Sequence, residues 1–549
     1  MALGLFGKPS VDAIGRAKDI KFLSAARPHM RGFHFSWTCF FLAFFAWFSI
    51  PPLANQIIDN LGLISNEGWA VSHMAAVSST IVMRVIIGPV CDVFGPRLAM
   101  CGLLVFGAIP VGLFGLVNGA TGLIVLRFFI GFIGATFVPC QYWTTLMFAP
   151  NTVGGANAFA GGWGNLGAGF TGLIMPWIFE GFHQHFNTKT ALSLAFAVPS
   201  AVVLFWASFC YFFSVDCPQG KYQNRIRPGE TLEEARERIA LSQGKLTAMH
   251  SQTTQVTDPA VLEAKDVVPK GYTHVLDALK DLCRNFNTLV LIIQYGACFG
   301  VELTVNGFLA RYFFRFFKDP ETGENQVDMK TAAMIASCFA LMNLFARAMG
   351  GLFSDLLNKY MNMTGRFIAQ GLCLILEGIT LLIFAEQRDV WDALGVVIVF
   401  SVFVQMSEGT SFGIVPFVSK KHTGVVSGLV GAGGNMGALA LGTAFKQLKD
   451  DYAQAFRIVG YFVLASSLLT PLLSIDGQYL WPNKRSFEAA REQREALAQN
   501  SPKYAHSPHA PNQKPTGINE SGIDRISLTE KKEMTPVEGG NGTAVGVEA

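Results

Sequence analysis

Two arginines inside apolar stretches are the residues whose spacing most clearly indicates chemistry. Each begins an Arg, Gly, Asp pattern with four-residue steps, which runs through Arg84, Gly88 and Asp92 and again through Arg347, Gly351 and Asp355. At about 1.5 Å per helical residue, each arginine lies roughly 12 Å from the aspartate that ends its pattern. A charge at that depth in a membrane costs at least about 2.5–3.5 kcal/mol, so both arginines are expected to face the protein interior and to have a role there.

The charge of these arginines points to an anionic ligand. The acids well inside the apolar stretches are few, namely Glu302, Glu377 and Glu408, and none shares a stretch with either arginine. A guanidinium presents a planar fork of donors that binds an oxyanion better than an ammonium does. We therefore predict an anion site formed by Arg84 and Arg347. The alternative, in which each arginine pairs with one of these acids and serves assembly, stays open at this point.

Two glycine-rich runs, at 161–169 and 431–437, form a second repeated feature. Small residues at these spacings let helix backbones approach closely, which explains the glycines without any ligand. Each run also holds an asparagine preceded by a glycine, and the two pairs are Gly164–Asn165 and Gly434–Asn435. A buried amide must find a polar partner or line the transport pathway. We predict that both asparagines donate to the anion, and that the glycines let their helices reach it.

The elements that must position these residues are membrane-spanning helices. Of 549 residues, 51% are hydrophobic and only 15% are charged, and the apolar residues fall in long blocks. Such blocks match a hydrocarbon core about 30 Å thick, and only helices or closed barrels satisfy their backbone groups there. We expect an all-α membrane protein with twelve transmembrane helices, at approximately 36–60, 68–91, 97–118, 121–147, 153–180, 189–214, 287–313, 330–356, 365–386, 390–418, 423–446 and 455–478.

The repeated pattern divides the chain into two six-helix pseudo-repeats, which should face each other across a substrate site near the bilayer midplane. The expected organisation is a cytoplasmic N-terminal segment, an N-terminal bundle, a cytoplasmic central loop, a C-terminal bundle and a largely disordered cytoplasmic tail, at 1–35, 36–214, 215–286, 287–480 and 481–549. Regulatory proteins are possible partners of the central loop or the tail. The net charge of +3 gives no basic surface for nucleic acid.

Orientation follows from the charges beside the first helices. The first 35 residues hold Lys8, Arg16, Lys18, Lys21, Arg27 and Arg31, whereas the loop 59–67 has no Lys or Arg. Because basic residues favour the cytoplasmic side, both termini are expected there. The loops 311–330 and 446–457 carry basic residues on the opposite side and depart from this pattern. No removable signal peptide is apparent at the N-terminus.

Two levels of resemblance accompany these patterns. Residues 88–97, Gly-Pro-Val-Cys-Asp-Val-Phe-Gly-Pro-Arg, resemble the G-x-x-x-D-x-x-G-x-R loop of the major facilitator superfamily, which implies the major facilitator fold. The runs at 161–169 and 431–437 resemble the two signature segments of the nitrate/nitrite porter family, which that family carries in its fifth and eleventh helices. Residues 36–48 and 295–303 resemble the first and seventh helices of the eukaryotic high-affinity nitrate transporters.

The resemblance implies roles for individual residues. Arg84 and Arg347 match the family's substrate arginines, and Asn165 and Asn435 fall on its signature asparagines. The aromatic residues that match the family's site are Tyr295, Phe299 and, less closely, Phe48.

The resemblance also implies a plasma-membrane importer of nitrate, and of nitrite, that uses protons as the coupling ion. Glu302 is a candidate for the proton-carrying group, with a structural role as the alternative. A nitrate/nitrite exchanger or exporter, and a nitrate sensor that does not transport, remain the rival functions. The sequence contains no catalytic nucleophile, metal cluster or phosphate loop, so neither an enzyme nor a bound cofactor is expected.

Overall fold

The structure is a computed structural model. It describes residues 6–53, 56–226, 284–319, 321–327, 329–419, 422–448 and 451–481, with a few further positions between 230 and 239 and at 488 and 491. Most of the central loop and nearly all of the tail expected from the sequence lie outside the described residues. Residues 1–495 form one compact unit, to which everything below refers.

Six spans make up the N-terminal half, and three of them include tighter 3-10 turns. They are α1 (His29–Trp47), α2 (Asn66–Phe94), α3 (Pro96–Gly112), α4 (Ala120–Gly131) continued through η4 (Phe132–Thr136) into α5 (Phe137–Met147), α6 (Val153–His183) and α7 (Thr188–Phe213). Short 3-10 and π segments extend α1 at Pro51–Leu53 and Gln56–Asn60, and a 3-10 turn extends α3 at Leu113–Leu116. The first helix therefore begins at His29, earlier than the expected 36.

The C-terminal half repeats this plan. Its helices are α11 (Phe286–Phe316), α12 (Met329–Leu341) continued through η8 (Met342–Leu344) into α13 (Ala346–Met361), α14 (Met363–Ala385), α15 (Val390–Val418), α16 (Thr423–Gln447) and α17 (Tyr452–Ser467), followed by η9 (Thr470–Leu472). Eleven segments of the described chain are long and apolar enough to span a membrane. Helix α6 adds the twelfth span of the expected fold, since its glycines and asparagines lower its apolar character but not its length.

Several helices begin at the residue types that satisfy free N–H groups at a helix start. The side chains of Ser65, Asn187, Asn285, Asp389 and Asp451 each accept a hydrogen bond from a backbone N–H in the first turn of the following helix. The sharp reversal between α2 and α3 depends on Gly95, whose φ of 91° is disfavoured for other residues. These local signals set where the helices begin, and packing sets how they cross.

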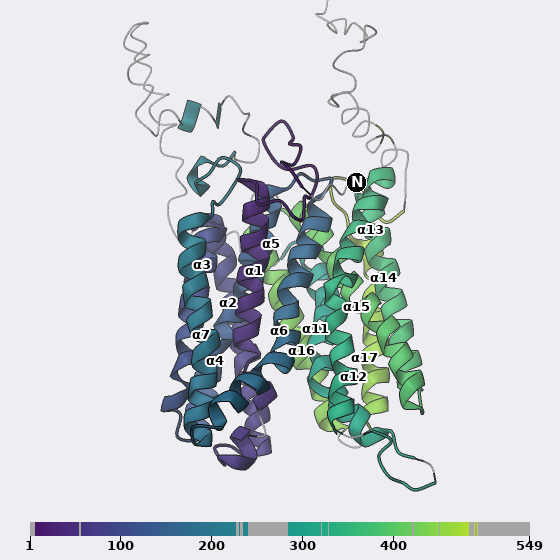
Figure 1. Ribbon diagram of the computed structural model, residues 1–549. Coiled ribbons are helices and arrows are strands. Elements are labelled where there is room, and N and C mark those ends of the chain that lie inside the picture. The colour runs from purple at the N-terminus through teal and green to yellow at the C-terminus, as the bar shows by residue number, and fades with distance from the viewer. Residues whose placement is uncertain are drawn as a thin grey trace, which may run out of the picture. The chain divides into compact units, whose positions relative to one another are not determined.

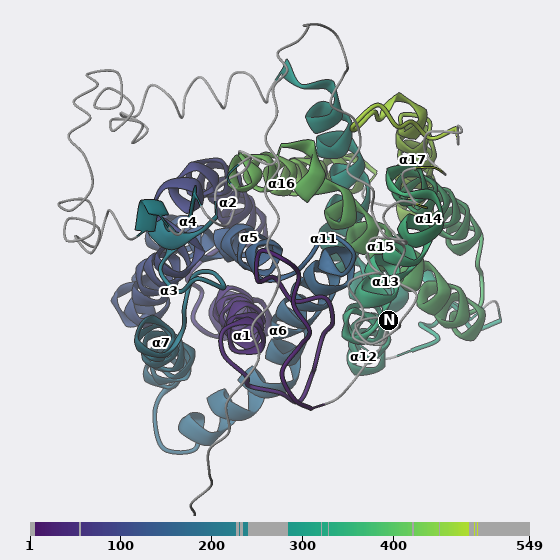
Figure 2. The same ribbon diagram turned by 90° about the horizontal axis from the view of Figure 1, so that it is seen from above.

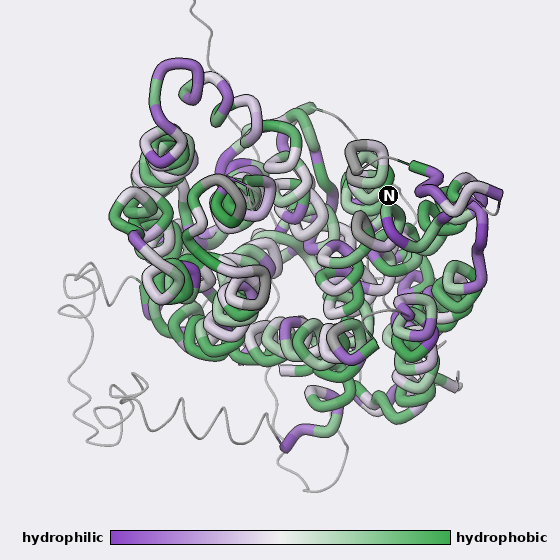
Figure 3. The backbone as a smooth tube through the Cα atoms, turned by 90° about the horizontal axis from the view of Figure 1, so that it is seen from below, coloured by the Kyte–Doolittle hydropathy of each residue, from purple (hydrophilic) through white to green (hydrophobic). Residues whose placement is uncertain are grey.

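The two halves lie side by side, with α2 against α16 and α6 against α13 (Figures 1 and 2). Figure 3 shows a mostly apolar tube along the helices, with hydrophilic stretches concentrated in the connections. Glycine permits both crossings between the halves. A Cβ on Gly88 would lie 2.6 Å from the Gly424 oxygen, and one on Gly351 would lie 2.5 Å from the Gly154 oxygen. Only glycine allows these backbones to approach so closely.

The aspartates of the repeated pattern join the halves at the end of the bundle where α1 begins, called the termini side below. Asp92 of α2 accepts N–H bonds of 3.1 Å from both Gly424 and Val425 in the first turn of α16. Asp355 of α13 accepts one of 2.6 Å from Gly155 in the first turn of α6. A carboxylate is favoured at a helix N-terminus, where free N–H groups and the helix dipole both attract it. Each Arg, Gly, Asp pattern therefore places its last two residues against the other half.

Candidate functional site

Arg84 lies at the interface of the two halves and is fully buried. Its Nη1 donates to the Gly431 oxygen of α16 at 2.6 Å, while Nε and Nη2 donate to the Gly134 oxygen at 3.3 and 3.2 Å. These acceptors are backbone carbonyls, and no carboxylate forms a salt bridge with Arg84 in the part of the chain that the structure describes. The positive charge of Arg84 is therefore solvated by peptide dipoles and remains uncompensated, as expected for an anion site.

Arg347 differs from Arg84, because a carboxylate neutralises it. Its Nη1 donates to Glu408 on α15, and its Nη2 donates to the hydroxyl of Tyr295 on α11 at 2.8 Å. Both members of the ion pair are at most 1% exposed. Pairing with one of the intramembrane acids, the alternative left open by the sequence, is thus observed for Arg347. The partner lies on another helix, so spacing along the chain could not reveal the pairing.

Three nearly parallel aromatic rings lie beside the arginines. The Tyr295 and Phe299 rings stack with centroids 5.3 Å apart, and Phe137 is inclined by only 16° and 10° to them. The Arg84 guanidinium lies 5.1 Å from the Phe299 centroid, and Phe137 lies 5.2 Å from Arg84 and 5.4 Å from Arg347. Cation–π contacts of this length stabilise desolvated guanidinium groups. The structure therefore brings Tyr295, Phe299 and both arginines together around Phe137.

The sequence analysis missed Phe137, which is the first residue of α5. Nothing in its spacing distinguishes it among the 47 phenylalanines of the chain. The short turn η4 precedes Phe137 and faces α2. The oxygen of Gly134 in this turn accepts from Arg84 of α2, and this contact brings Phe137 to the site. This carbonyl and the neighbouring ring form one side of the arginine pocket.

Phe48 lies apart from this group. It is the C-cap of α1, and its described ring contacts are with Phe44 at 5.7 Å and Trp47 at 4.9 Å. The residue of α1 whose ring contacts Phe137 is Phe40, with centroids 5.6 Å apart. Phe40 lies two helical turns before Phe48 and so at a different depth. The role that the resemblance implied for Phe48 has no counterpart in these contacts.

The two signature asparagines are buried, and their hydrogen bonding is incomplete. Neither the Oδ1 nor the Nδ2 atom of Asn435 has a hydrogen-bond partner among the described residues. Asn165 donates weakly to Glu302 at 3.4 Å, and its Oδ1 has no partner there. A buried polar group without a partner costs about 1–3 kcal/mol. An oxyanion can accept from the free Asn435 Nδ2, which is the chemistry predicted for that residue, whereas the free oxygens of both asparagines need a donor that nitrate does not carry.

The paired glycines make room for the aromatic rings. A Cβ on Gly434 would lie 2.6 Å from Phe299 Cδ1 and 2.9 Å from Tyr295 Cδ1. A Cβ on Gly164 would overlap Phe40 Cδ1 at 1.8 Å. Both positions therefore require glycine for ring packing, Gly434 directly at the site and Gly164 on the side of α1.

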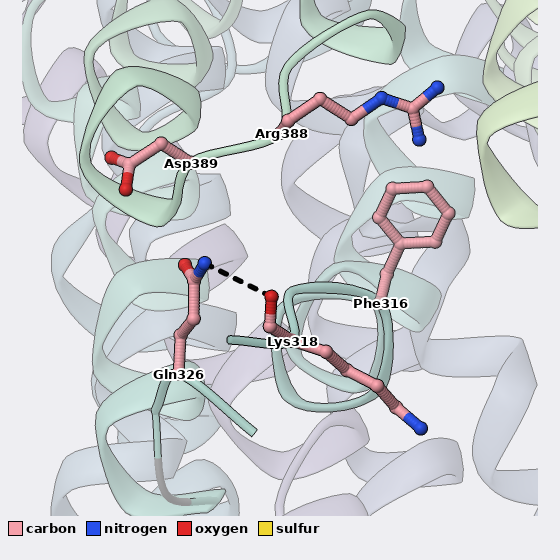
Figure 4. A pocket seen from close by; sticks show the side chains of 5 residues that line it. All are labelled: Phe316, Lys318, Gln326, Arg388 and Asp389. Atoms are coloured by element: carbon pink, nitrogen blue, oxygen red, sulfur yellow. Dashed lines mark hydrogen bonds between the residues drawn. The ribbon is translucent and has the colours of Figure 1, made fainter. Parts of the chain in front are cut away.

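A separate pocket of about 480 Å³ opens on the side opposite the termini. It is lined by Phe316, Lys318, Gln326, Arg388 and Asp389, and Gln326 donates to the Lys318 carbonyl at 3.3 Å (Figure 4). None of the predicted site residues lines it. Across the described residues, no three His, Cys, Asp or Glu side chains are grouped to hold a metal ion. The buried arginine cluster therefore remains the candidate site.

Comparison with known proteins agrees with the geometry. Residues 36–442 match the model of the Major Facilitator Superfamily. The "High affinity nitrate transporter 2.5" of Arabidopsis thaliana is 36% identical over 434 residues, which cover 78% of this chain and 76% of that protein. The "Nitrate transporter 2.1" of Chlamydomonas reinhardtii is 33% identical over 474 residues, with coverage of 85% and 78%. The chain belongs to the nitrate/nitrite porter family.

Two more distant matches are a cyanobacterial relative and a solved structure. The "Nitrate/nitrite transporter NrtP" of Picosynechococcus is 29% identical over 475 residues, covering 77% of this chain and 86% of that one. Among solved structures, the proton:xylose symporter XylE superimposes with a TM-score of 0.55 at 12% identity, over 84% of this chain and 99% of that chain. That likeness shows the major facilitator fold. The porter is therefore a multi-pass membrane protein, and its matched relatives are transporters.

Proposed function

We propose that this porter is a secondary active transporter that imports nitrate, and also nitrite, by proton symport and alternating access. The observation that carries the proposal is the pair of buried arginines, one from each half, which flank Phe137. The buried amide of Asn435 on α16, which has no hydrogen-bond partner among the described residues, adds a donor. The relatives named above as nitrate transporters and as a nitrate/nitrite transporter support this choice of anion.

A planar oxyanion suits this arrangement. Its flat face can lie against the nearly parallel rings of Phe137, Tyr295 and Phe299, and its oxygens can accept from both guanidinium forks. The Asn435 amide offers a further donor whose buried N–H bonds are unsatisfied among the described residues. A rigid, mostly apolar site with few donors should favour a small, weakly hydrated anion over a phosphate, which carries more charge and needs more donors.

Alternating access would use the two crossings described above. With Asp92 bonded to α16 and Asp355 bonded to α6, the halves are held together on the termini side. Rocking of one half against the other around the arginines would break these bonds and expose the site to that side. Each aspartate then exchanges helix N–H groups for water, which limits the free-energy difference between the two states.

The direction of transport sets the coupling requirement. A negative cell interior opposes an entering anion by about 2.3 kcal/mol per charge per 100 mV. One proton per nitrate cancels that term, and more than one makes uptake electrically favourable. We place the porter in the plasma membrane with both termini in the cytoplasm, so that the segments 215–286 and 481–549 would be accessible there to regulatory proteins.

Reconstitution in proteoliposomes tests this function against its rivals. With an inward proton gradient and no internal anion, nitrate should accumulate, and nitrite should compete with it. An exchanger would require internal nitrate or nitrite for any uptake, and a sensor would bind nitrate without flux. Accumulation that persists when an ionophore collapses the proton gradient would contradict proton symport.

A further inference from the structure

Three buried acids lie in the C-terminal half beside the arginine site. Glu302 of α11, Glu377 of α14 and Glu408 of α15 are each at most 3% exposed. Substrate binding as described above uses none of them. Three carboxyl groups buried so close to a pair of guanidinium groups need an account, because burying an unpaired charge is costly.

Glu408 makes the decisive contacts. One of its oxygens pairs with Arg347 Nη1, while Oε1 receives no hydrogen bond from the described residues. A free carboxylate oxygen, buried beside the substrate arginine, is an acceptor to which a proton can bind. The geometry therefore places a carboxylate that can accept a proton directly on the substrate arginine.

Glu302 connects the signature asparagine of the other half to the segment that precedes Arg347. One oxygen of Glu302 accepts from Asn343 Nδ2 at 2.5 Å, and the other accepts from Asn165 Nδ2 at 3.4 Å. Asn165 lies on α6 in the N-terminal half, and Asn343 lies on η8 just before Arg347. The hydrogen bonds of Glu302 thus link the segment that carries Arg347 to a side chain across the interface.

A charge balance at Arg347 indicates what nitrate does to Glu408. The titratable and charged groups around Glu408 are Arg84 on α2, Tyr295, Cys298 and Glu302 on α11, Arg347 on α13 and Glu377 on α14. In the ion pair the carboxylate of Glu408 balances the charge of Arg347. A bound nitrate replaces that carboxylate in the balance, and a buried Glu408 that has lost its partner must then take up a proton.

We propose that Glu408 occupies the place of nitrate on Arg347 and becomes protonated when nitrate displaces it. In this step a proton from the aqueous side forms an O–H bond on the carboxylate, and Arg347 exchanges that carboxylate for the nitrate oxygens. The inference rests on the proposed proton-coupled nitrate transport and names the group that performs the coupling. Proton binding and nitrate binding thereby favour each other, because protonation of Glu408 frees Arg347 for nitrate and nitrate on Arg347 leaves Glu408 without its partner.

Nitrate affinity measured against pH tests the exchange on the full-length protein in detergent. If one proton is taken up with each nitrate, the wild-type affinity should weaken about tenfold per pH unit above the pH at which Glu408 loses its proton. In Glu408→Gln the competing carboxylate is gone, so binding should be independent of pH and at least tenfold tighter than wild type at alkaline pH. Glu377→Gln is the matched control, because it also neutralises a buried acid. Among the described residues Glu377 forms no salt bridge with Arg347, so this variant should keep the wild-type dependence of nitrate affinity on pH.

Transport separates this inference from the function on which it rests. In proteoliposomes Glu408→Gln should retain nitrate counterflow and lose accumulation driven by a proton gradient. If wild type accumulates nitrate with the gradient and Glu408→Gln does so equally well, Glu408 is not the coupling group and the inference fails. If wild type shows no gradient dependence, proton symport itself fails.

A second measurement covers the case in which Glu408→Gln does not fold. The wild-type protein, in weakly buffered solution with a pH indicator, should take up about one proton for each nitrate bound. Uptake of no protons would overturn the exchange. Size-exclusion chromatography of each variant establishes which of the two measurements applies.

Discussion

Replacing Arg347 by lysine keeps the charge and removes the fork, which makes it the most direct test of the site. In the structure the guanidinium donates from Nη1 to Glu408 and from Nη2 to the Tyr295 hydroxyl, and its Cζ lies 5.4 Å from the Phe137 centroid. A lysine ammonium donates from a single nitrogen, so it can hold the carboxylate or the hydroxyl in good geometry, but not both.

The size of the defect follows from these contacts. One hydrogen bond involving a charged group contributes about 1.5–3 kcal/mol. A nitrate ion that takes the place of Glu408 would lose the second arm of the fork, and at about 1.4 kcal/mol per factor of ten its affinity should fall roughly tenfold to a hundredfold. The apparent affinity for uptake, normalised to protein in the membrane, measures this loss.

Arg457→Lys supplies the control. Arg457 pairs with Glu386 at 2.6 Å on the surface, where side-chain exposures are 27% and 58%. Such an exposed pair contributes only about 0–1 kcal/mol, so this variant should transport like wild type. If Arg347→Lys binds nitrate within twofold of wild type, a planar fork at this position is not needed and the proposed substrate contact is wrong.

Two further predictions concern the signature runs. An ionisable acid replaces a donor amide in Asn165→Asp and Asn435→Asp, and these variants should abolish nitrate uptake while the protein still reaches the membrane. Smaller defects in nitrate affinity are expected for Asn165→Ala and Asn435→Ala. Near-normal uptake by all four variants would assign the asparagines to packing. Gly434→Ala should force the Phe299 ring to move, at about 1–3 kcal/mol, and should lower nitrate affinity and thermal stability together. Gly442→Ala on the same helix meets no atom within 4 Å and should be neutral in both assays; equal behaviour of the two variants would exclude a steric role for Gly434.

Much of this porter is determined by local features of the sequence. The apolar blocks predict membrane-spanning helices, because in lipid a backbone must satisfy its own polar groups. Glycine, proline and capping residues fix where most helices begin, and Gly95 fixes the turn between α2 and α3. The repeat identifies Arg84 and Arg347 as equivalent positions at mid-depth, because a four-residue step keeps side chains on nearly one helix face.

The tertiary structure decides which groups these residues meet. Spacing along α2 and α13 treats the two arginines alike, yet only Arg347 has a carboxylate partner among the described residues, because Glu408 comes from α15 while Arg84 faces backbone carbonyls. Contacts between different helices also bring Phe137 into the site and leave Phe48 out of it. Partners of this kind are set by how distant helices cross, and crossing depends on shape complementarity over whole helix faces. Local sequence encodes the depth of a residue in the membrane, and helix packing alone determines what it contacts there.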